Sequence, residues 1–152
     1  LEKVLSYVKL AKEEGGTVLC GGNSIQLEGE CAEGWYMEPT VIEGLSYNCR
    51  TNQEEIFGPV VTLTPFDSED EALNYANSTT YGLASVIWTE NLTRTHRIAN
   101  ALHTGIVWVN CWLLRDLRTP FGGVKSSGVG REGGFEALHF FTEPKNVCIK
   151  IK

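Results

Sequence analysis

The sequence contains no apolar run close to the ~20 residues that a membrane-spanning helix requires, so no membrane span is predicted. Positive charge is scarce as well, because 13 Lys and Arg residues stand against 19 Asp and Glu residues, a formal net charge of -6. Surfaces that bind nucleic acids carry the opposite sign. We therefore expect neither a membrane nor a nucleic acid among the partners of this protein.

Closely spaced cysteine pairs are missing too. The five cysteines form no C-x-x-C motif, their number is odd, and the three histidines have no metal-ligand spacing. Zinc sites need paired ligands, and disulfide scaffolds need a higher density of cysteine. We therefore expect no metal site, and we predict reduced, buried thiols in a cytoplasmic protein. The cysteines are Cys20, Cys31, Cys49, Cys111 and Cys148.

Motifs for nucleotides and activated serines are absent or incomplete. No G-x-S-x-G is present, and Gly123-Val124-Lys125-Ser126 is not a phosphate-binding loop because its Gly and Lys are not adjacent. Gly128-x-Gly130-x-x-Gly133 has the letters of the dinucleotide fingerprint. It does not closely follow a predicted strand, however, and no acidic residue lies ~20 residues further on in a following strand. We interpret it as a flexible backbone turn.

What the sequence does have is an alternation of helical and strand patterns over 152 residues, 42% of them hydrophobic. That length fits one domain of ~100–150 residues or part of a larger one. The alternation predicts an α/β fold with an open, largely parallel sheet and flanking helices. Helical spacing covers residues 1–14, 68–76, 92–102 and 131–141. Extended or apolar strand-like runs cover residues 17–20, 35–37, 40–42, 60–64, 84–88 and 106–109.

Three local patterns refine this prediction. Ser68-Glu69-Asp70-Glu71 is a capping box, in which the Ser hydroxyl accepts from a free amide and the Glu bonds back. Residues 23–34 are polar and contain Gly, which is typical of a surface loop. Residues 147–151 alternate apolar and polar side chains, which predicts a half-exposed strand.

Residues 54–59, Glu54-Glu55-Ile56-Phe57-Gly58-Pro59, place two acids, an aromatic ring and a Gly-Pro turn directly before a predicted strand. A carboxylate in this place can accept hydrogen bonds from two vicinal ribose hydroxyls, and a flat ring can pack beside a nicotinamide. The alternative is a solvated pair of acids next to a core Phe, and the pattern by itself leaves that alternative open.

Residues 120–132 form a second dense stretch, Pro120-Phe121-Gly122-Gly123 followed by Lys125 to Glu132. So many glycines cost conformational entropy on folding. Such a stretch is expected where the backbone closely approaches a ligand or another segment, and the alternative is a long mobile surface loop.

These stretches occur in an order that resembles the C-terminal part of the aldehyde dehydrogenase superfamily, and the resemblance covers essentially the whole chain. A further segment, residues 110–116, is most similar to the branch that oxidises 2-aminomuconic-type semialdehydes. The motifs are Glu54-Glu55-Ile56-Phe57-Gly58-Pro59-Val60, Tyr81-Gly82-Leu83, Val107-Trp108-Val109-Asn110, and Pro120-Phe121-Gly122-Gly123-x-Lys125-x-Ser127-Gly128-x-Gly130-Arg131-Glu132.

The resemblance implies a chemistry. In the family, a Cys thiolate attacks the aldehyde, hydride passes to NAD(P)+, and a water activated by Glu hydrolyses the thioester. By the same resemblance, Glu55 holds the nicotinamide ribose of NAD or NADP, and Phe57 and Leu83 line the nicotinamide pocket. Residues from Asn110 to Phe121 shape the aldehyde tunnel. We expect these groups to share one cleft.

The sequence also departs from the family pattern, since none of its cysteines lies in the nucleophile motif. The general-base Glu and the dinucleotide-binding fold are not found, and no initiator Met is present. We therefore expect a fragment without catalytic residues that is inactive alone, with a catalytic-domain portion at 1–142 and an oligomerisation strand at 143–152. The parent is expected to be a homodimer or homotetramer. The alternatives are a non-catalytic interaction or regulatory product and a ligand-free structural domain.

Arg115 supports a sharper hypothesis about the substrate. A guanidinium in the aldehyde tunnel can bind a distal carboxylate in bidentate fashion, worth ~1.5–3 kcal/mol as a charged hydrogen bond. The substrate would then be a semialdehyde that carries a carboxylate, held beside Phe121. The alternative is a surface Arg115 paired with Asp116, and Arg118 is a competing candidate.

Overall fold

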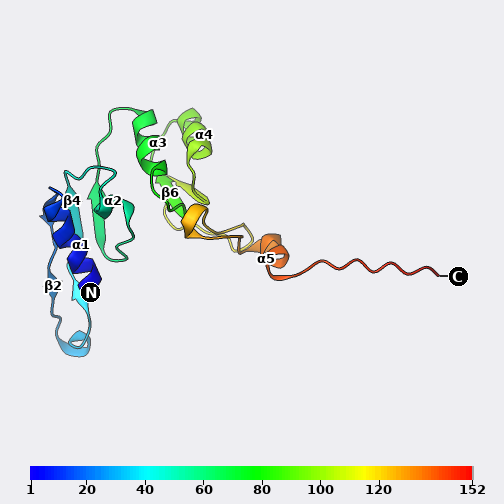
Figure 1. Cartoon of the computed structure of the whole chain (residues 1–152), viewed down its shortest axis with the longest axis horizontal. Helices are drawn as coiled ribbons and strands as arrows, with labels where there is room; N and C mark the ends of the chain where they lie inside the picture. The colour runs from blue at the N-terminus through cyan, green and yellow to red at the C-terminus, as the bar shows by residue number, and fades with distance from the viewer. Residues whose placement is uncertain (152) are drawn as a thin grey trace. The chain divides into compact units, whose positions relative to one another are not determined.

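The computed structural model describes residues 1–151 (Figure 1). The chain divides into two compact units, which are Leu1–Ser78 (unit 1) and the residues from Thr79 onward (unit 2). Unit 1 contains α1 (Glu2–Glu13), β1 (Thr17–Cys20), β2 (Ser24–Ile25), the 3-10 turn η1 (Gly29–Cys31), β3 (Tyr36–Met37), β4 (Thr40–Glu43), α2 (Arg50–Gln53), β5 (Val60–Leu63) and α3 (Glu69–Asn77).

Helix α1 forms as its apolar spacing predicts. Val4, Val8 and Ala11 recur on one face and are buried, because residues three and four apart share one side of a helix. The helix ends at Glu13, Gly15 two residues later has a φ of 92°, and the amide of Gly16 donates to the carbonyl of Ala11 at 2.8 Å. A positive φ of this kind is readily adopted only by Gly.

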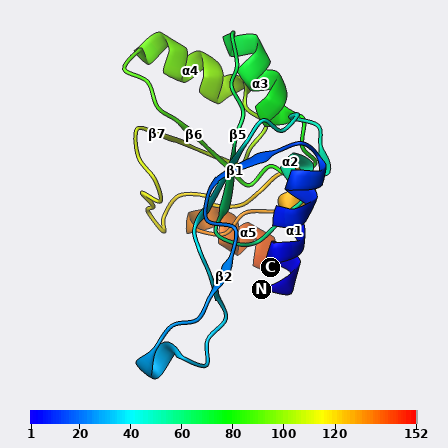
Figure 2. The ribbon, with the colours of Figure 1, turned by 90° about the vertical axis from the view of Figure 1, so that its left-hand side faces the viewer.

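The core of unit 1 lies between α1 and a three-stranded sheet. Ala11, Ile42 and Leu45 form its buried cluster, with Val18 and Val60 packed against it. The strand order is β1-β4-β5, with β4 antiparallel to β1 and parallel to β5. Parallel neighbours need a crossover connection, and the chain between β4 and β5 passes through α2. Figure 2 shows α1 next to α2, and it shows β2, β3 and η1 as a separate arm.

The N-terminus of α2 is capped from the end of α1. The Glu14 carboxylate accepts hydrogen bonds from the amides of Arg50 at 3.0 Å and Thr51 at 3.1 Å, and from the Thr51 hydroxyl at 2.6 Å. Partial burial opposes ionisation, but these donors together hold the pKa of Glu14 below its usual value. One carboxylate therefore joins two helices and satisfies amides that a helix start leaves free.

The capping box at the start of α3 is confirmed, with one difference. The amide of Glu71 donates to the Ser68 hydroxyl at 3.2 Å, as predicted. The Glu71 carboxylate reaches one residue further back than the motif implies and accepts from the amide of Asp67 at 2.7 Å. The other end of the helix is fixed by the stacked rings of Tyr47 and Tyr75, whose centroids are 4.5 Å apart.

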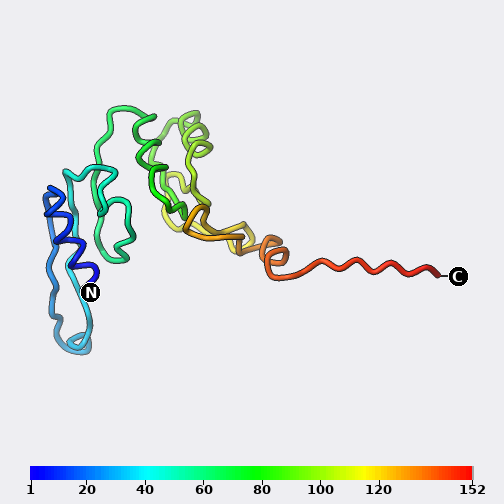
Figure 3. The backbone as a smooth tube through the Cα atoms, in the orientation of Figure 1, coloured from blue at the N-terminus to red at the C-terminus, as the bar shows by residue number. Residues whose placement is uncertain are grey.

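Unit 2 is built on two parallel strands joined by a helix. Strands β6 and β7 pair in parallel from Ala84↔Ile106 to Ile87↔Val109, and α4 forms the crossover that such a pair requires (Figure 3). The Asn91 side chain caps α4 by accepting from the amide of Arg94 at 2.9 Å. The elements are β6 (Ala84–Ile87), α4 (Leu92–Ala101), β7 (Ile106–Val109), the 3-10 turn η2 (Lys125–Ser127) and α5 (Gly134–Phe141).

The predicted α/β character and the parallel pairing are confirmed, but a single open sheet is not found among residues 1–151. The strands form three small sheets, of which β2-β3 is antiparallel and was predicted only as loop and extended chain. The antiparallel β1-β4 contact also departs from the prediction. It arises because the chain returns from β1 through the β2-β3 arm instead of crossing over through a helix.

The C-terminal strand is not formed in this structure. Residues 143–151 are exposed and have no strand partner among the described residues, and a strand is stable only when its backbone groups are paired. The predicted oligomerisation segment 143–152 includes Lys152, which lies outside the described residues. Helix α5 also begins later than predicted, at Gly134 instead of near Arg131, because Glu132 is held in a bridge to Phe121.

The prediction of buried thiols is wrong for this chain. Cys20, Cys31 and Cys148 are exposed, and Cys49 and Cys111 are half-buried. The exposed thiols lie on the outer strand β1, in the β2-β3 arm and in the C-terminal segment, where little apolar surface is available to cover them. All five are free.

Replacing Glu14 by Gln should lower the free energy of unfolding by about 0.5–2 kcal/mol, the usual loss for a helix cap. Because the folded-state pKa lies below the ordinary value of 4.5, the contribution is complete above that pH and is lost as pH falls through the folded value. Urea unfolding at pH 7 and at stepwise lower pH measures this. Glu13→Gln, one residue away and exposed, is the matched control and should change stability by less than about 0.5 kcal/mol. Equal losses for both variants would contradict the capping role.

Candidate functional site

The turn that carries the predicted cofactor residues of unit 1 is tied down at Glu54. The Arg50 guanidinium donates to both Glu54 carboxylate oxygens, at 2.7 and 3.0 Å, and the Tyr7 hydroxyl donates to the same carboxylate at 2.5 Å. These donors, Arg50 above all, lower the pKa of Glu54 to about 2. Glu54 is therefore an ionised anchor that joins α1, α2 and the turn.

Its neighbour Glu55 is placed differently. The Glu55 side chain is exposed, and among residues 1–151 no hydrogen bond or ion pair engages its carboxylate. Two residues later, Phe57 has 84% of its surface exposed and a φ of 58°. That backbone conformation costs a side chain larger than Gly roughly 1–2 kcal/mol. The expected alternative of a core Phe is therefore wrong, and the ring is available to a ligand.

The far end of the turn is closed by backbone contacts. Gly58 lies so close to α1 that a Cβ would come within 2.6 Å of both methyl groups of the buried Val4. The carbonyl of Pro59 accepts from the amide of Thr40 at 2.8 Å, which attaches the turn to β4. Glu55 and Phe57 thus project from a turn that is fixed on both sides.

In unit 2, the segment Tyr81-Gly82-Leu83 makes direct hydrogen bonds to residues 120–132, which we call the glycine-rich stretch. The carbonyl of Gly82 accepts from the amides of Gly105 at 3.0 Å and Val124 at 2.9 Å, and the amide of Gly82 donates to the Ser127 hydroxyl at 2.9 Å. Leu83, predicted for the nicotinamide pocket, follows this junction and is 46% exposed.

The glycines of the stretch serve close packing. A Cβ on Gly105, just before β7, would lie 1.7 Å from the carbonyl oxygen of Gly122, so only Gly can occupy that place. Phe121 and Glu132 exchange two backbone hydrogen bonds of 2.8 Å each. The Arg131 guanidinium donates to the carbonyl of Gly123 at 2.8 Å. These contacts agree with the expected close approach of the backbone to another segment.

A hollow of about 370 Å³ lies over this stretch in unit 2. Two of the predicted site residues, Leu83 and Phe121, line it together, and the glycine-rich stretch up to Glu132 contributes most of the remaining wall. Phe140 and Phe141 of α5 close one side. The resemblance assigns Leu83 to the nicotinamide pocket and Phe121 to the aldehyde tunnel, and the structure brings both residues to the same hollow.

Arg115 lies beside Phe121. Its guanidinium carbon is 4.0 Å from the centre of the Phe121 ring, and its Nη2 donates to the Glu132 carboxylate at 2.5 Å. The expected alternative, a pair with Asp116, is wrong, because Asp116 binds Arg118 through three contacts of 2.5 to 3.1 Å. That ion pair lowers the pKa of Asp116. It also engages the guanidinium of Arg118, the competing candidate for binding a substrate carboxylate.

The segment before Arg115 is shaped by side-chain contacts with the main chain. The side-chain oxygen of Asn110 accepts from the backbone amide of Thr89 at 2.9 Å, and its side-chain nitrogen donates to the backbone carbonyl of Thr89 at 2.8 Å. These two bonds extend the β6-β7 contact beyond the strands. The Trp108 indole donates to the carbonyl of Leu114 at 2.8 Å and meets Trp112 edge to face, with centroids 5.1 Å apart. These contacts fold the predicted tunnel segment back over β7.

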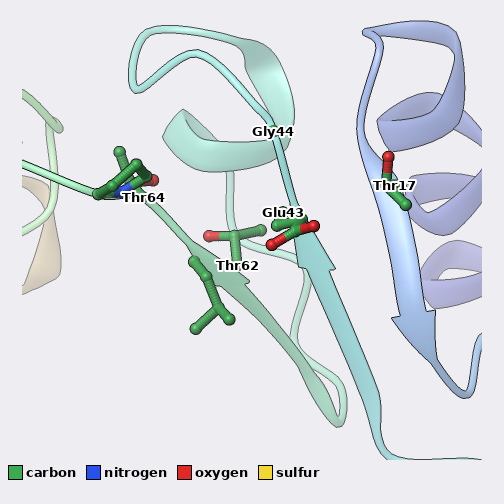
Figure 4. A pocket seen from close by; sticks show the side chains of 7 residues that line it. Thr17, Glu43, Gly44, Thr62 and Thr64 are labelled. Atoms are coloured by element: carbon green, nitrogen blue, oxygen red, sulfur yellow. The ribbon is translucent and has the colours of Figure 1, made fainter.

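A second hollow, of about 720 Å³, lies in unit 1 at the ends of β1, β4 and β5 (Figure 4). None of the predicted site residues lines it, and Glu43 is the ionisable residue on its wall. Its larger volume does not make it the better candidate, because neither the turn at residues 54–59 nor the glycine-rich stretch contributes to its wall. The lining residues are Thr17, Glu43, Gly44, Thr62, Leu63, Thr64 and Pro65.

The predicted site residues thus fall into two groups. Glu55 and Phe57 belong to unit 1, and Leu83, Arg115 and Phe121 belong to unit 2. A cleft that contains both groups stays a prediction. Sequence reasoning missed Tyr7, which is 47 residues from Glu54 and has no local signal, whereas Arg50 and Glu54 have the i, i+4 spacing of a helix pair.

The described residues hold no arrangement typical of a metal centre, since no three His, Cys, Asp or Glu side chains converge in residues 1–151. No helix in that part of the chain combines the length and apolarity needed to cross a bilayer. Burial raises the pKa of the half-buried Cys49 thiol, and the nearby Glu14 carboxylate adds to this, so Cys49 is not activated as a nucleophile.

Comparison with known proteins identifies relatives over nearly the whole chain. It is 55% identical over 150 residues to the 2-aminomuconic 6-semialdehyde dehydrogenase of a Pseudomonas species, covering 99% of this chain and 30% of that protein. It is 54% identical over 150 residues to the 2-hydroxymuconic semialdehyde dehydrogenase of Pseudomonas sp. strain CF600, again covering 99% of this chain and 31% of the relative. The chain therefore spans about a third of the length of these relatives, and the predicted resemblance to the muconic semialdehyde branch is confirmed.

Solved structures agree with the sequence relatives. An aldehyde dehydrogenase from Bacillus cereus, determined as a complex with NAD+, superposes with a TM-score of 0.90 at 44% identity, over 99% of this chain and 30% of that one. The sequence profile of the aldehyde dehydrogenase family matches residues 1–147. With that match over almost its full length, and with its four motifs in the expected order, this chain belongs to the aldehyde dehydrogenase family.

Proposed function

We propose that this chain forms the C-terminal portion of an NAD-dependent dehydrogenase that oxidises a semialdehyde bearing a carboxylate to the corresponding acid, with NADP as the alternative cofactor. The observation that carries the proposal is that Leu83 and Phe121 line one hollow and that the Arg115 guanidinium lies 4.0 Å from the Phe121 ring centre. Family membership and the names of the relatives support the same reaction class. A non-catalytic role has no comparable observation in its favour.

The residues of the Glu55–Phe57 turn fit a nicotinamide nucleotide. The Glu55 carboxylate is exposed and unengaged among the described residues, so it can accept two hydrogen bonds from vicinal ribose hydroxyls. The exposed Phe57 ring offers a flat apolar face for a nicotinamide. When bound, the nucleotide supplies the acceptor for hydride. Glu54 is excluded from ribose binding, because Arg50 and Tyr7 already engage its carboxylate.

The residues of unit 2 are suited to holding and orienting the aldehyde. Phe121 provides an apolar wall for the aldehyde, and Leu83 in the same hollow provides one for the nicotinamide, so that together they exclude water from the reacting carbon. The Arg115 guanidinium can attract a carboxylate at the other end of the substrate, because a charged planar donor favours bidentate binding. The chain would thereby select for acidic semialdehydes, while the nucleophile and general base come from the remainder of the enzyme.

The assembly of the enzyme is also part of the proposal. Val147, Ile149 and Ile151, at alternating positions of the C-terminal segment, are 68, 77 and 89% exposed. An unpaired, half-apolar segment of this kind gains backbone partners by joining a sheet of another subunit. We propose a homodimer or homotetramer in which residues 143–152 pair across subunits, and a cytoplasmic location consistent with free thiols.

The chain on its own should not catalyse hydride transfer, because no thiol in it is placed as the family nucleophile. Incubating residues 1–152 with NAD+ and either hexanal or 2-hydroxymuconic semialdehyde should give no NADH absorbance above a protein-free blank. The Pseudomonas 2-aminomuconic 6-semialdehyde dehydrogenase serves as the positive control. Turnover by the chain that is abolished by thiol alkylation would overturn this part of the proposal.

In the full-length dehydrogenase, Glu55→Gln should raise the KM for NAD+ by about 10-fold or more. The reason is the loss of charge-assisted hydrogen bonds worth ~1.5–3 kcal/mol. Steady-state kinetics at saturating aldehyde measures the change. Glu28→Gln, an exposed acid in the β2-β3 arm, is the matched control with the same change in charge and should leave this KM unaltered. A change below twofold for Glu55→Gln would remove Glu55 from the cofactor site.

Arg115→Ala in the full-length dehydrogenase should raise the KM for 2-hydroxymuconic semialdehyde by about 10-fold or more, the loss expected for a charged hydrogen bond, and should affect hexanal much less. The comparison of two aldehydes isolates the distal carboxylate from the reacting group. Arg118→Ala, whose guanidinium is already bound to Asp116, is the control and should not distinguish the two substrates. Equal effects of Arg115→Ala on both aldehydes would refute the role of Arg115.

A further inference from the structure

The side chain of Arg115 lies in a segment that has no helix or strand to fix its direction. Residues 110–120 form no regular element, and an Arg side chain has many rotamers whose restriction costs up to ~2 kcal/mol. A guanidinium that recognises a carboxylate by its planar edge must nevertheless be held in one orientation. The question is therefore which groups of the chain hold it.

Two side chains meet the guanidinium from different directions. The ring of Phe121 lies against it at 4.0 Å, measured from the guanidinium carbon to the ring centre. The Glu132 carboxylate accepts from Nη2 at 2.5 Å. The ring restricts tilting of the guanidinium plane, and the carboxylate restricts rotation within that plane.

These two groups are themselves fixed to one another. Phe121 and Glu132 form an antiparallel bridge with two backbone hydrogen bonds of 2.8 Å. Directly opposed residues in such a pair present their side chains on the same face. The ring and the carboxylate therefore act as one rigid support, although they are separated by the glycine-rich stretch in the sequence.

The support leaves donors of Arg115 available. A guanidinium has five N–H groups, and the contact with Glu132 engages Nη2 alone. The pair is partly exposed, with 36% of the Arg115 side chain and 57% of the Glu132 side chain accessible. A ligand carboxylate can thus reach the remaining edge without displacing Glu132.

We propose that Glu132, together with Phe121, is a positioning residue that orients Arg115 for the carboxylate of the substrate. This inference rests on the proposed function, because it assigns to Glu132 an effect that is transmitted through Arg115. Glu132 lines the same hollow, and the role proposed for its carboxylate is to hold the guanidinium, with no part in bond making. Its removal should weaken recognition of acidic substrates in particular.

A double-mutant cycle in the full-length dehydrogenase tests the proposal. The wild type, Glu132→Gln, Arg115→Ala and the double variant are compared by kcat/KM for 2-hydroxymuconic semialdehyde relative to hexanal. Glu132→Gln should lower this ratio by about 3- to 5-fold, the upper range for a partly exposed ion pair. In the Arg115→Ala background it should have no further effect, because the group that it orients is gone. Glu136→Gln, an exposed acid on α5, controls for the change in net charge and should leave the ratio unaltered.

Each contrary result has a distinct meaning. If Arg115→Ala lowers the ratio but Glu132→Gln acts additively with it, Glu132 does not act through Arg115 and this inference fails while the proposed function stands. If Glu132→Gln raises the ratio, Glu132 competes with the substrate carboxylate, and the positioning role is refuted. If Arg115→Ala leaves the ratio unchanged, the carboxylate site and this inference fail together. Should Glu132→Gln not fold, Phe121→Leu tests the same support and should lower the ratio only where Arg115 is present.

Discussion

The structure of unit 2 depends on a single close approach of two backbones. Gly105, directly before β7, lies so near the carbonyl of Gly122 that no side chain fits between them. This contact holds the glycine-rich stretch against the β6-β7 pair. The Gly82 carbonyl strengthens the attachment, because it accepts hydrogen bonds from the amides of both Gly105 and Val124. Because the stretch is fixed there, Phe121 lines the same hollow as Leu83, and the Glu132 carboxylate accepts a hydrogen bond from Arg115. The hollow over the glycine-rich stretch is therefore a product of backbone packing.

The adjacent residues Glu54 and Glu55 of unit 1 have the same side chain but different surroundings, and they differ in role accordingly. Glu54 is held by Arg50 and Tyr7 and stays ionised, with a pKa of about 2. It serves the stability of the turn. Glu55, one residue later, is exposed, and no hydrogen bond or ion pair among residues 1–151 engages its carboxylate. The strained Phe57 follows it, with a φ of 58°. The turn is thus held through the first acid, while the second acid and the aromatic ring, for which we propose cofactor binding, are exposed.

Much of the fold could be predicted from the sequence, because helical spacing and β-branched runs report local burial. The spacing of Val4, Val8 and Ala11 predicts α1, and Ser68 predicts the start of α3. What the sequence could not predict depends on contacts between distant residues. The antiparallel direction of β1 follows from the path of the chain through the β2-β3 arm. The partner of Arg115 could not be chosen from its neighbours, since Asp116 is taken by Arg118 and Glu132 lies 17 residues away.

The bridge between Phe121 and Glu132 has a consequence for how this region can change in evolution. The segment between them is closed at its ends by two hydrogen bonds and filled by tight glycine contacts. Adding or deleting a residue there would shift the bridge by one position and turn the ring and the carboxylate to opposite faces. The β2-β3 arm carries no such restriction on its exposed tip at residues 26–34. Variation in length among homologous proteins should accumulate in the arm, while the Phe121–Glu132 segment keeps a constant residue count.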